Sequence, residues 1–301
     1  MCLSQLNFSG SPLPPAIDIG RNASGEARRR PRAVLRPAFS SAQLDHRALW
    51  SYRELFGVLV WRLIIVRYKE TTIGIAWAVL QPIGLMLVLV IFFGVFARVP
   101  SNGVPYPLFV YPGLLIWQFC SQSFNQGSMA IVNNGQLVTR VYFPRGLLPA
   151  AVVSASLVDL LLAFPALLVL MLYYGVSPSV GALILLPMLV VTVLLSLGVA
   201  LLFSCLNVFY RDVVYVLPFL TQIWMFSSPV IYPLSMVPER WQFVYALNPL
   251  VAVIETARWG FAGGPPVRIA DLAIALAVSL AVFGVGVRYF HRREPIFSDI
   301  I

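Results

Sequence analysis

The longest uncharged stretch of this chain is residues 160–210, LLLAFPALLVLMLYYGVSPSVGALILLPMLVVTVLLSLGVALLFSCLNVFY, which contains no Asp, Glu, Lys or Arg. Residues 71–97 and 99–139 lack all four residue types as well. About 20 consecutive apolar residues are enough to cross a bilayer as a helix. Of the 301 residues, 59% are hydrophobic and only 11% are charged, so the sequence predicts an all-α polytopic membrane protein.

Six transmembrane helices are predicted when the apolar segments are separated at their polar and basic interruptions. They are Thr72–Phe96, Leu108–Val132, Leu147–Tyr174, Val180–Phe209, Val213–Tyr232 and Ile269–Phe290. The segment 241–261 is also apolar, but it contains Asn248-Pro249, Glu255 and Arg258. Because proline removes a backbone donor and interrupts a helix, we expect here a re-entrant outer-face segment of two short half-helices.

The rest of the chain divides into three further predicted segments. Residues 1–45 are rich in Pro, Ser, Ala and Arg and predict a disordered cytoplasmic tail, or alternatively a contact with anionic lipid head groups. Residues 46–70 carry apolar side chains every three or four positions and predict an amphipathic interfacial helix, or else a solvated helix packed on the bundle. The six-helix domain then covers 71–291, and 292–301 form a second cytoplasmic tail.

The distribution of basic residues predicts the orientation in the membrane. With the N-terminus inside, 17 of the 21 Lys and Arg residues fall on the cytoplasmic side. Cytoplasmic loops carry an excess of these residues. We therefore expect a multi-pass protein with both termini in the cytoplasm.

Several functions are disfavoured by what the sequence lacks. The two histidines are in polar flanks, and no CxxC or Cys/His cluster occurs, so a metal site is not expected. The single lysine, Lys69, follows Tyr68 and is not part of the Gly-Lys-Ser/Thr motif that binds nucleotide phosphates. We expect no cofactor on this chain and no nucleic-acid partner.

Polar and aromatic residues within the apolar segments indicate a possible channel lining. The second predicted span is unusually polar, and aromatic rings can pack against sugars, although the same residues also serve as helix contacts and interfacial belts. The predicted lining comprises Trp77, Trp117, Gln118, Gln122, Asn125, Trp224 and Phe226. Asp159 lies within the third span, where a carboxylate usually faces a cavity or a partner, so it is either a functional group or a structural hydrogen-bonding one.

Several motifs in chain order resemble a known family. The run Leu137-Val138-Thr139-Arg140-Val141-Tyr142-Phe143-Pro144-Arg145 is similar to the cytoplasmic signature of the type-2 ABC permeases of the polysaccharide export family, which includes O-antigen, capsule and teichoic-acid exporters. The segments 67–82, 207–212, 228–233 and 248–250 resemble other parts of these permeases, so the resemblance covers roughly residues 48–295.

The resemblance implies a division of labour between chains. The permease would form a homodimer in the bacterial inner membrane, with two copies of a cytosolic ABC ATPase that bind ATP and Mg. The substrate would be a polyprenyl-diphosphate-linked glycan, with O-antigen as the first expectation. The coupling helix would comprise Leu137, Arg140, Val141, Tyr142, Phe143 and Arg145, and the interfacial gate helix would carry Arg53, Arg62, Arg67 and Lys69.

Other functions remain open at this point. A type-2 ABC permease for capsule, teichoic acid, lipid or drug would keep the fold and change only the substrate. An integral-membrane enzyme that modifies glycans would need clustered acidic or His residues, but the acidic residues here are scattered over different segments. A passive channel would have no use for a coupling loop.

Overall fold

The computed structural model describes residues 52–69, 73–141 and 143–297, which all belong to one compact unit, Asp45–Ile301. The predicted tail 1–45, Tyr142 and residues 298–301 lie outside the described residues. Within the described ranges the protein is helical and contains no strand, as predicted from the apolar segments.

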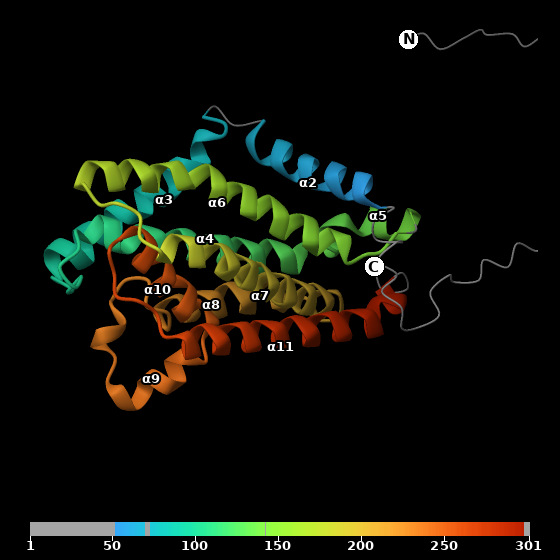
Figure 1. Cartoon of the computed structure of the whole chain (residues 1–301). Helices are drawn as coiled ribbons and strands as arrows, with labels where there is room; N and C mark the ends of the chain where they lie inside the picture. Colours follow the sequence, from blue (N-terminus) through green and yellow to red (C-terminus); the bar gives the residue numbers. More distant parts are fainter. Residues whose placement is uncertain (1–51, 70–72, 142, 298–301) are drawn as a thin grey trace, which may run out of the picture. The chain divides into compact units, whose positions relative to one another are not determined.

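The helices follow one another with short connections (Figure 1). They are α2 (Arg53–Tyr68), α3 (Ala76–Leu89), the π-helical η1 (Val90–Phe96), α4 (Tyr106–Met129), η2 (Val132–Asn134), α5 (Gly135–Arg140), α6 (Leu147–Tyr174), α7 (Gly181–Phe209), α8 (Val213–Phe226), η3 (Leu234–Met236), α9 (Glu239–Ala246), α10 (Pro249–Phe261), α11 (Ile269–Arg293) and η4 (Glu294–Ile296).

Four helical segments of the described chain are long and apolar enough to cross a membrane. These are Ala76–Phe96, Leu147–Tyr174, Gly181–Phe209 and Ile269–Ile296, and they correspond to four of the six predicted spans. The second predicted span forms the continuous helix α4, which carries many polar residues. The fifth ends early, at Phe226, so α8 has 14 residues and extends about 21 Å at 1.5 Å per residue.

Helix α4 lies at the centre of the helix contacts. It packs against α3, α6, α7, α8 and α10, and side chains such as Leu108, Tyr111 and Phe124 are fully buried along it. The Tyr111 hydroxyl donates to the carbonyl of Ala163 on α6 at 3.1 Å. A helix enclosed on several sides can carry amides and hydroxyls, because neighbouring helices supply their partners.

The long helices define two ends of the bundle. At the α5 end, the loop after α5 meets the C-terminal end of α11, where the Arg145 backbone N–H donates to Glu294 at 2.9 Å. At the α10 end, the segment between α6 and α7 meets α10, where the Ser179 N–H donates to the Gly260 carbonyl at 2.9 Å. Helix α6 closes just before this contact at Gly175, whose φ of 67° is the left-handed conformation that ends many helices.

Helices α7 and α11 approach each other more closely than side chains would allow. A Cβ atom added to Gly286 would come within 2.3 Å of the Gly198 carbonyl oxygen, and one added to Gly198 would come within 2.7 Å of the Phe283 backbone. Small residues let helix backbones pack closely where lipid supplies no hydrophobic drive for association. We call this contact the Gly198–Gly286 notch.

The predicted half-helices correspond to α9 and α10. Asn248 caps α10 through its side-chain oxygen, which accepts from the Leu250 N–H at 3.1 Å, and Pro249 is the first helical residue. The break at Asn248-Pro249 is therefore confirmed, while the dip of the two helices into the membrane stays a prediction.

Candidate functional site

Helix α2 packs along α6 and ends at a carboxylate within it. Leu59 joins the buried cluster that contains Ala151 and Val152 of α6. The last turn of α2 brings Arg67 and Tyr68 to Asp159, which lies 12 residues after the start of α6, or about 18 Å along its axis. The predicted helix is therefore packed on the bundle, and its place at the membrane interface stays a prediction.

Asp159 has a defined set of partners. An Arg67 guanidinium nitrogen forms an ion pair with one carboxylate oxygen, and the Tyr68 hydroxyl donates to the other. Arg67 also donates to the side-chain oxygens of Gln122, at 3.5 Å, and Gln126 on α4. We call the contacts of Arg67 and Tyr68 with Asp159 the α2 tether. It joins α2 to α6, and Arg67 extends the contact to α4.

The electrostatics of the tether follow from its partial burial. Burial lowers the pKa of the Arg67 guanidinium, and the neighbouring Tyr68 opposes that shift. Burial likewise raises the pKa of the Tyr68 phenol, and the charge of Arg67 opposes it. Tyr68 is therefore a neutral hydroxyl donor at physiological pH, so the cluster contains one cation and one anion.

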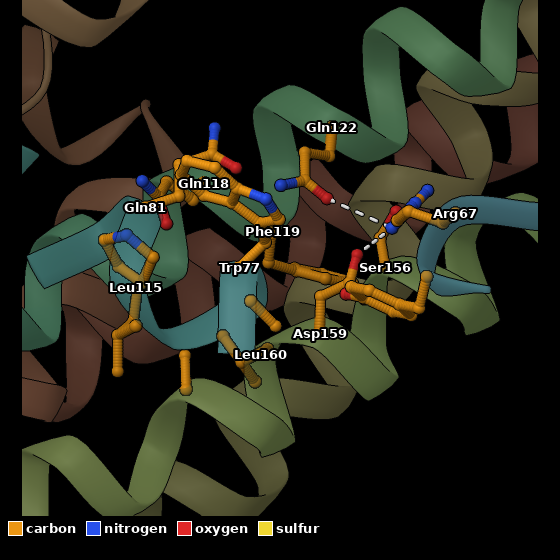
Figure 2. A pocket seen from close by; sticks show the side chains of 14 residues that line it. Arg67, Trp77, Gln81, Leu115, Gln118, Phe119, Gln122, Ser156, Asp159 and Leu160 are labelled. Carbon is orange, nitrogen blue, oxygen red and sulfur yellow. Dashed lines mark hydrogen bonds and ion pairs between the residues drawn. The ribbon is translucent and has the colours of Figure 1, made fainter. Parts of the chain in front are cut away.

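A cavity of about 150 Å³ opens beside the tether (Figure 2). One predicted gate residue and several predicted lining residues meet here. Arg67 of α2 faces the same space as Trp77 of α3 and as Gln118 and Gln122 of α4. The remaining lining residues are Tyr68, Ala78, Gln81, Pro82, Leu115, Phe119, Ser156, Asp159, Leu160 and Ala163. Asp159, Tyr68, Gln81 and Ser156 were not among the predicted site residues.

The other predicted lining residues lie elsewhere. Trp117 is 5% exposed and belongs to the core. Asn125 donates to the Ser121 carbonyl at 2.8 Å and to the Thr221 hydroxyl of α8 at 3.4 Å. Asn125 is thus engaged in a helix contact, one of the alternatives considered for the polar span.

Trp224 and Phe226 lie at the α10 end. Trp224 stacks on Phe124 with 5.2 Å between ring centroids and donates to Asn248 at 3.1 Å. Phe226 is exposed and lines a separate outer pocket with Trp241 and Tyr245. One continuous lining is therefore not seen within the described chain, and the role of these residues in a channel stays a prediction.

A second hollow lies at the α5 end. A groove of about 720 Å³ is lined by residues of α5 and its flanks together with Arg62 of α2. Three predicted coupling residues, Leu137, Arg140 and Val141, line it. Arg62 and Arg140 both carry positive charge on its walls. Among the other predicted gate residues, Arg53 and Lys69 are exposed.

Phe143 and Arg145 face inward and do not line this groove. Phe143 is 4% exposed and packs in the cluster that contains Leu148, Phe290 and Phe297. The Arg145 guanidinium donates to the Glu294 carbonyl oxygen and lies over the Phe297 ring. Residues 292–297, predicted as part of a tail, thus continue as helix and pack against the loop after α5. We call residues Glu294–Phe297 the C-terminal clip.

The sequence did not predict that Arg258, at the α10 end, would connect several segments of the chain. Its guanidinium donates to the carbonyls of Phe109, Val230 and Tyr232 at 3.1, 2.8 and 3.4 Å and to Glu255 at 2.7 Å. It also lies 3.7 Å above the Phe109 ring. The signal for it in the sequence is the i, i+3 spacing of Glu255 and Arg258 within an apolar segment.

The described residues contain no group of three or more His, Cys, Asp or Glu side chains that would hold a metal ion. The polar groups of the cavity and the groove are amides, hydroxyls, one ion pair and arginines, set among apolar side chains. Such groups bind and orient hydroxylated or charged molecules.

Comparisons with known proteins show the family to which the chain belongs. Residues 54–262 match the family model of the ABC-2 type transporter. The chain is 31% identical to the O-antigen export system permease protein RfbA of Myxococcus xanthus over 85% of this chain and 98% of that protein.

Other relatives are export permeases of the same kind. An O-antigen export system permease protein RfbA of Klebsiella pneumoniae is 26% identical over 82% of this chain and 95% of its own length. The polysialic acid transport protein KpsM of Escherichia coli is 25% identical over 77% of this chain and 91% of its own length. With the family model covering most of the helical region, the chain belongs to the ABC-2 type transporter family and matches its polysaccharide-export permeases.

Proposed function

We propose that this chain is the permease subunit of an ABC exporter that moves a lipid-linked polysaccharide from the cytoplasmic to the outer side of the bacterial inner membrane. A homodimer would form the path, and two copies of a separate ATPase would drive it with ATP and Mg. The observation that carries the proposal is the groove in which the predicted coupling residues of α5 meet Arg62 of α2.

This groove has the features that a cytosolic partner needs. Arg140 and Val141 are exposed, and Asn133, Gln136 and Thr139 add polar groups to the same walls. An exposed surface with both apolar and hydrogen-bonding groups suits a protein interface. Because Arg62 lies only five residues before Arg67 of the tether on α2, a partner seated in the groove would contact the helix that reaches the polar cavity.

O-antigen is the first substrate to test. The relative from Myxococcus xanthus named as an O-antigen export permease is matched over almost its whole length. Capsule polysaccharide is the second candidate, because the permeases KpsM and CtrC, named for polysialic acid and capsule export, also match. All three are transport permeases, which favours a transport role over an enzymatic one.

The proposal includes six membrane passages with both termini inside. Helix α4 would be the polar second span and α8 with the following turn the fifth, while α9 and α10 would form the re-entrant segment. The hydrogen bonds of Arg258 to the carbonyls of Val230 and Tyr232 support this assignment, because they satisfy polar groups of non-helical backbone at the α10 end. The basic residues of the α5 end agree with a cytoplasmic location.

Genetic replacement tests the function. Cells that lack this chain should lose surface polysaccharide and accumulate the lipid-linked glycan on the cytoplasmic side, and the chain supplied from a plasmid should restore export. A matched strain would carry the cognate ATPase with its phosphate-binding lysine replaced, and it should show the same loss. Export that persists without the ATPase, or ATP binding by the purified permease alone, would contradict the two-chain proposal.

A further inference from the structure

The cavity beside the α2 tether has a balanced chemical character. Its one cation, Arg67, is paired with its one anion, Asp159. Three glutamine side chains, Gln81, Gln118 and Gln122, add amide donors and acceptors. Each amide offers a carbonyl oxygen and an NH₂ group. The cavity therefore presents a dense set of neutral hydrogen-bonding groups with no uncompensated charge.

One polar atom of this site lacks a protein partner. The Ser156 hydroxyl is buried, lines the cavity and makes no hydrogen bond within the described chain. Leaving a buried hydroxyl unsatisfied costs free energy comparable to a lost hydrogen bond. Ser156 lies one turn before Asp159 on α6, so both groups belong to the same wall. Ser156 is therefore a lining residue whose covered hydroxyl needs a hydrogen-bond partner, which a ligand that reaches it would supply.

Trp77 supplies the apolar surface of the site. Its side chain lines the cavity and the residue remains 47% exposed, and Figure 2 shows it beside Gln81 and Gln118. The face of an aromatic ring is negative and attracts polarised C–H groups. The volume of about 150 Å³ is comparable to cavities that hold a single six-membered ring, as benzene fills an engineered cavity of about 150 Å³.

We propose that this cavity binds one sugar ring of the transported glycan and that binding opens the α2 tether. The proposal rests on the proposed export function and names a subsite within it. Hydroxyls of the sugar would bond to Ser156, to the glutamine amides and to the Asp159 carboxylate, with the C–H face of the ring on Trp77. A sugar hydroxyl that donates to Asp159 competes with Arg67 and Tyr68 for the same oxygens.

Release of the tether would loosen one end of α2. Arg67 and Tyr68 are consecutive residues at the end of that helix, so both contacts with α6 are lost together. Arg67 would keep the Gln126 oxygen as a partner, which limits the cost of leaving Asp159. Arg62, one and a half turns earlier on α2, lines the groove at the α5 end. A ligand in the cavity that loosens α2 would therefore alter the contacts of a protein bound in that groove.

Sugar binding is tested by saturation-transfer NMR on the permease–ATPase complex in nanodiscs. The probes are the monosaccharides released by acid hydrolysis of the host cell's own surface polysaccharide, and inorganic pyrophosphate as an anionic competitor. We expect transfer to ring C–H protons of a sugar, and Trp77→Ala or Gln118→Leu should weaken binding about tenfold or more. Glu239→Gln is the control, because it removes an exposed carboxylate in the first turn of α9 that does not line the cavity.

Opening of the tether is tested by hydrogen–deuterium exchange in the last turn of α2. In the wild-type complex the sugar should speed exchange of the amides in residues 64–69. Asp159→Asn should exchange fast without sugar, and Glu239→Gln should behave as the wild type. Sugar binding with unchanged or slower exchange in α2 would overturn the release, and binding of pyrophosphate through Arg67 in place of any sugar would overturn the sugar assignment.

These outcomes are separate from those of the export assay. If wild-type cells export polysaccharide through this chain but no monosaccharide binds the cavity, the subsite is wrong and the export function stands. If the chain does not support export at all, the proposed function is wrong whatever the cavity binds.

Discussion

Among the described residues, the arginine–carboxylate pairs Arg258–Glu255 and Arg67–Asp159 are held in different ways. Arg258 at the α10 end is 2% exposed, and three of its partners are backbone carbonyls of other segments. Arg67 at the end of α2 is 24% exposed and is bonded only to side chains of α4 and α6. A cavity adjoins the second pair.

The difference separates a structural contact from an adjustable one. Backbone carbonyls cannot rotate away, so Arg258 fixes α10 against the start of α4 and the segment at 230–232. Side-chain partners can take new rotamers, and water or a ligand in the cavity can replace them. The same ion-pair chemistry thus stabilises one region and leaves the other able to rearrange.

The largest effect is expected for Arg258→Leu. This change leaves Glu255 and three carbonyls without their donor, and breaking a buried charged network costs about 3–5 kcal/mol. The protein should lose its folded yield and its monodisperse profile in size-exclusion chromatography. Arg67→Leu is the comparison variant and should remain folded. Equal loss of folding in both variants would contradict the claim that Arg258 is a fixed structural contact and Arg67 an adjustable one.

A smaller effect is expected in the Gly198–Gly286 notch, which belongs to the fixed part of the molecule. Gly286→Ala places a methyl group against the backbone of α7, and overpacking of this kind costs about 1–3 kcal/mol. Gly284→Ala on the same helix is the control, because an added Cβ has nothing within 4 Å. The apparent Tm should fall for Gly286→Ala and stay level or rise for Gly284→Ala.

The tether itself should contribute less to stability. A double-mutant cycle of Arg67→Gln and Asp159→Asn should give a coupling energy of about 1 kcal/mol, because the pair is partly exposed beside a cavity. The measurement is thermal unfolding of the four proteins in one detergent. A coupling energy as large as the cost of Arg258→Leu would show that the α2 tether is a fixed structural contact.

The smallest stability change, with a distinct functional effect, is expected at the C-terminal clip. Glu294→Ala removes the acceptor of the Arg145 N–H, so the loop after α5 should become less well positioned while stability changes by about 1 kcal/mol or less. Export per ATP hydrolysed should fall in the complex. Glu239→Ala, an exposed acidic residue in the first turn of α9, is the control and should leave that ratio unchanged.

Helix positions were predicted well wherever apolar length alone sets them. The span Leu147–Tyr174 agrees with α6, and Val180–Phe209 agrees with α7 to within one residue. The fifth span was predicted too long, because apolar residues continue to Tyr232 while the helix ends before Ser227-Ser228-Pro229. Hydropathy does not register the turn after Phe226, because Val230, Ile231 and Tyr232 are apolar as well. A proline alone would not have predicted this end, since α8 continues through Pro218.

The site was only partly predictable, for a physical reason. Periodicity shows which residues share a face of one helix, but not which helix covers that face. Gln118 and Asn125 were both predicted to line a channel, yet Gln118 lines the cavity while Asn125 bonds to α8. The pairing of Arg67 with Asp159 joins residues separated by 92 positions, and nothing local to either one specifies it.

The Gly198–Gly286 notch also bears on how the chain is made. Helix α7 is complete at Phe209, but its partner α11 begins at Ile269, so the ribosome must synthesise residues 210–268 before the notch can close. At about 5–20 residues per second, this interval lasts several seconds. During that time the bare backbone groove of α7 faces lipid, the translocon or another chain. Packing of α11 against α7 is therefore among the last steps of biogenesis. A chain that stops before Ile269 would leave the α7 surface at Gly198 uncovered and open to the quality-control machinery of the membrane.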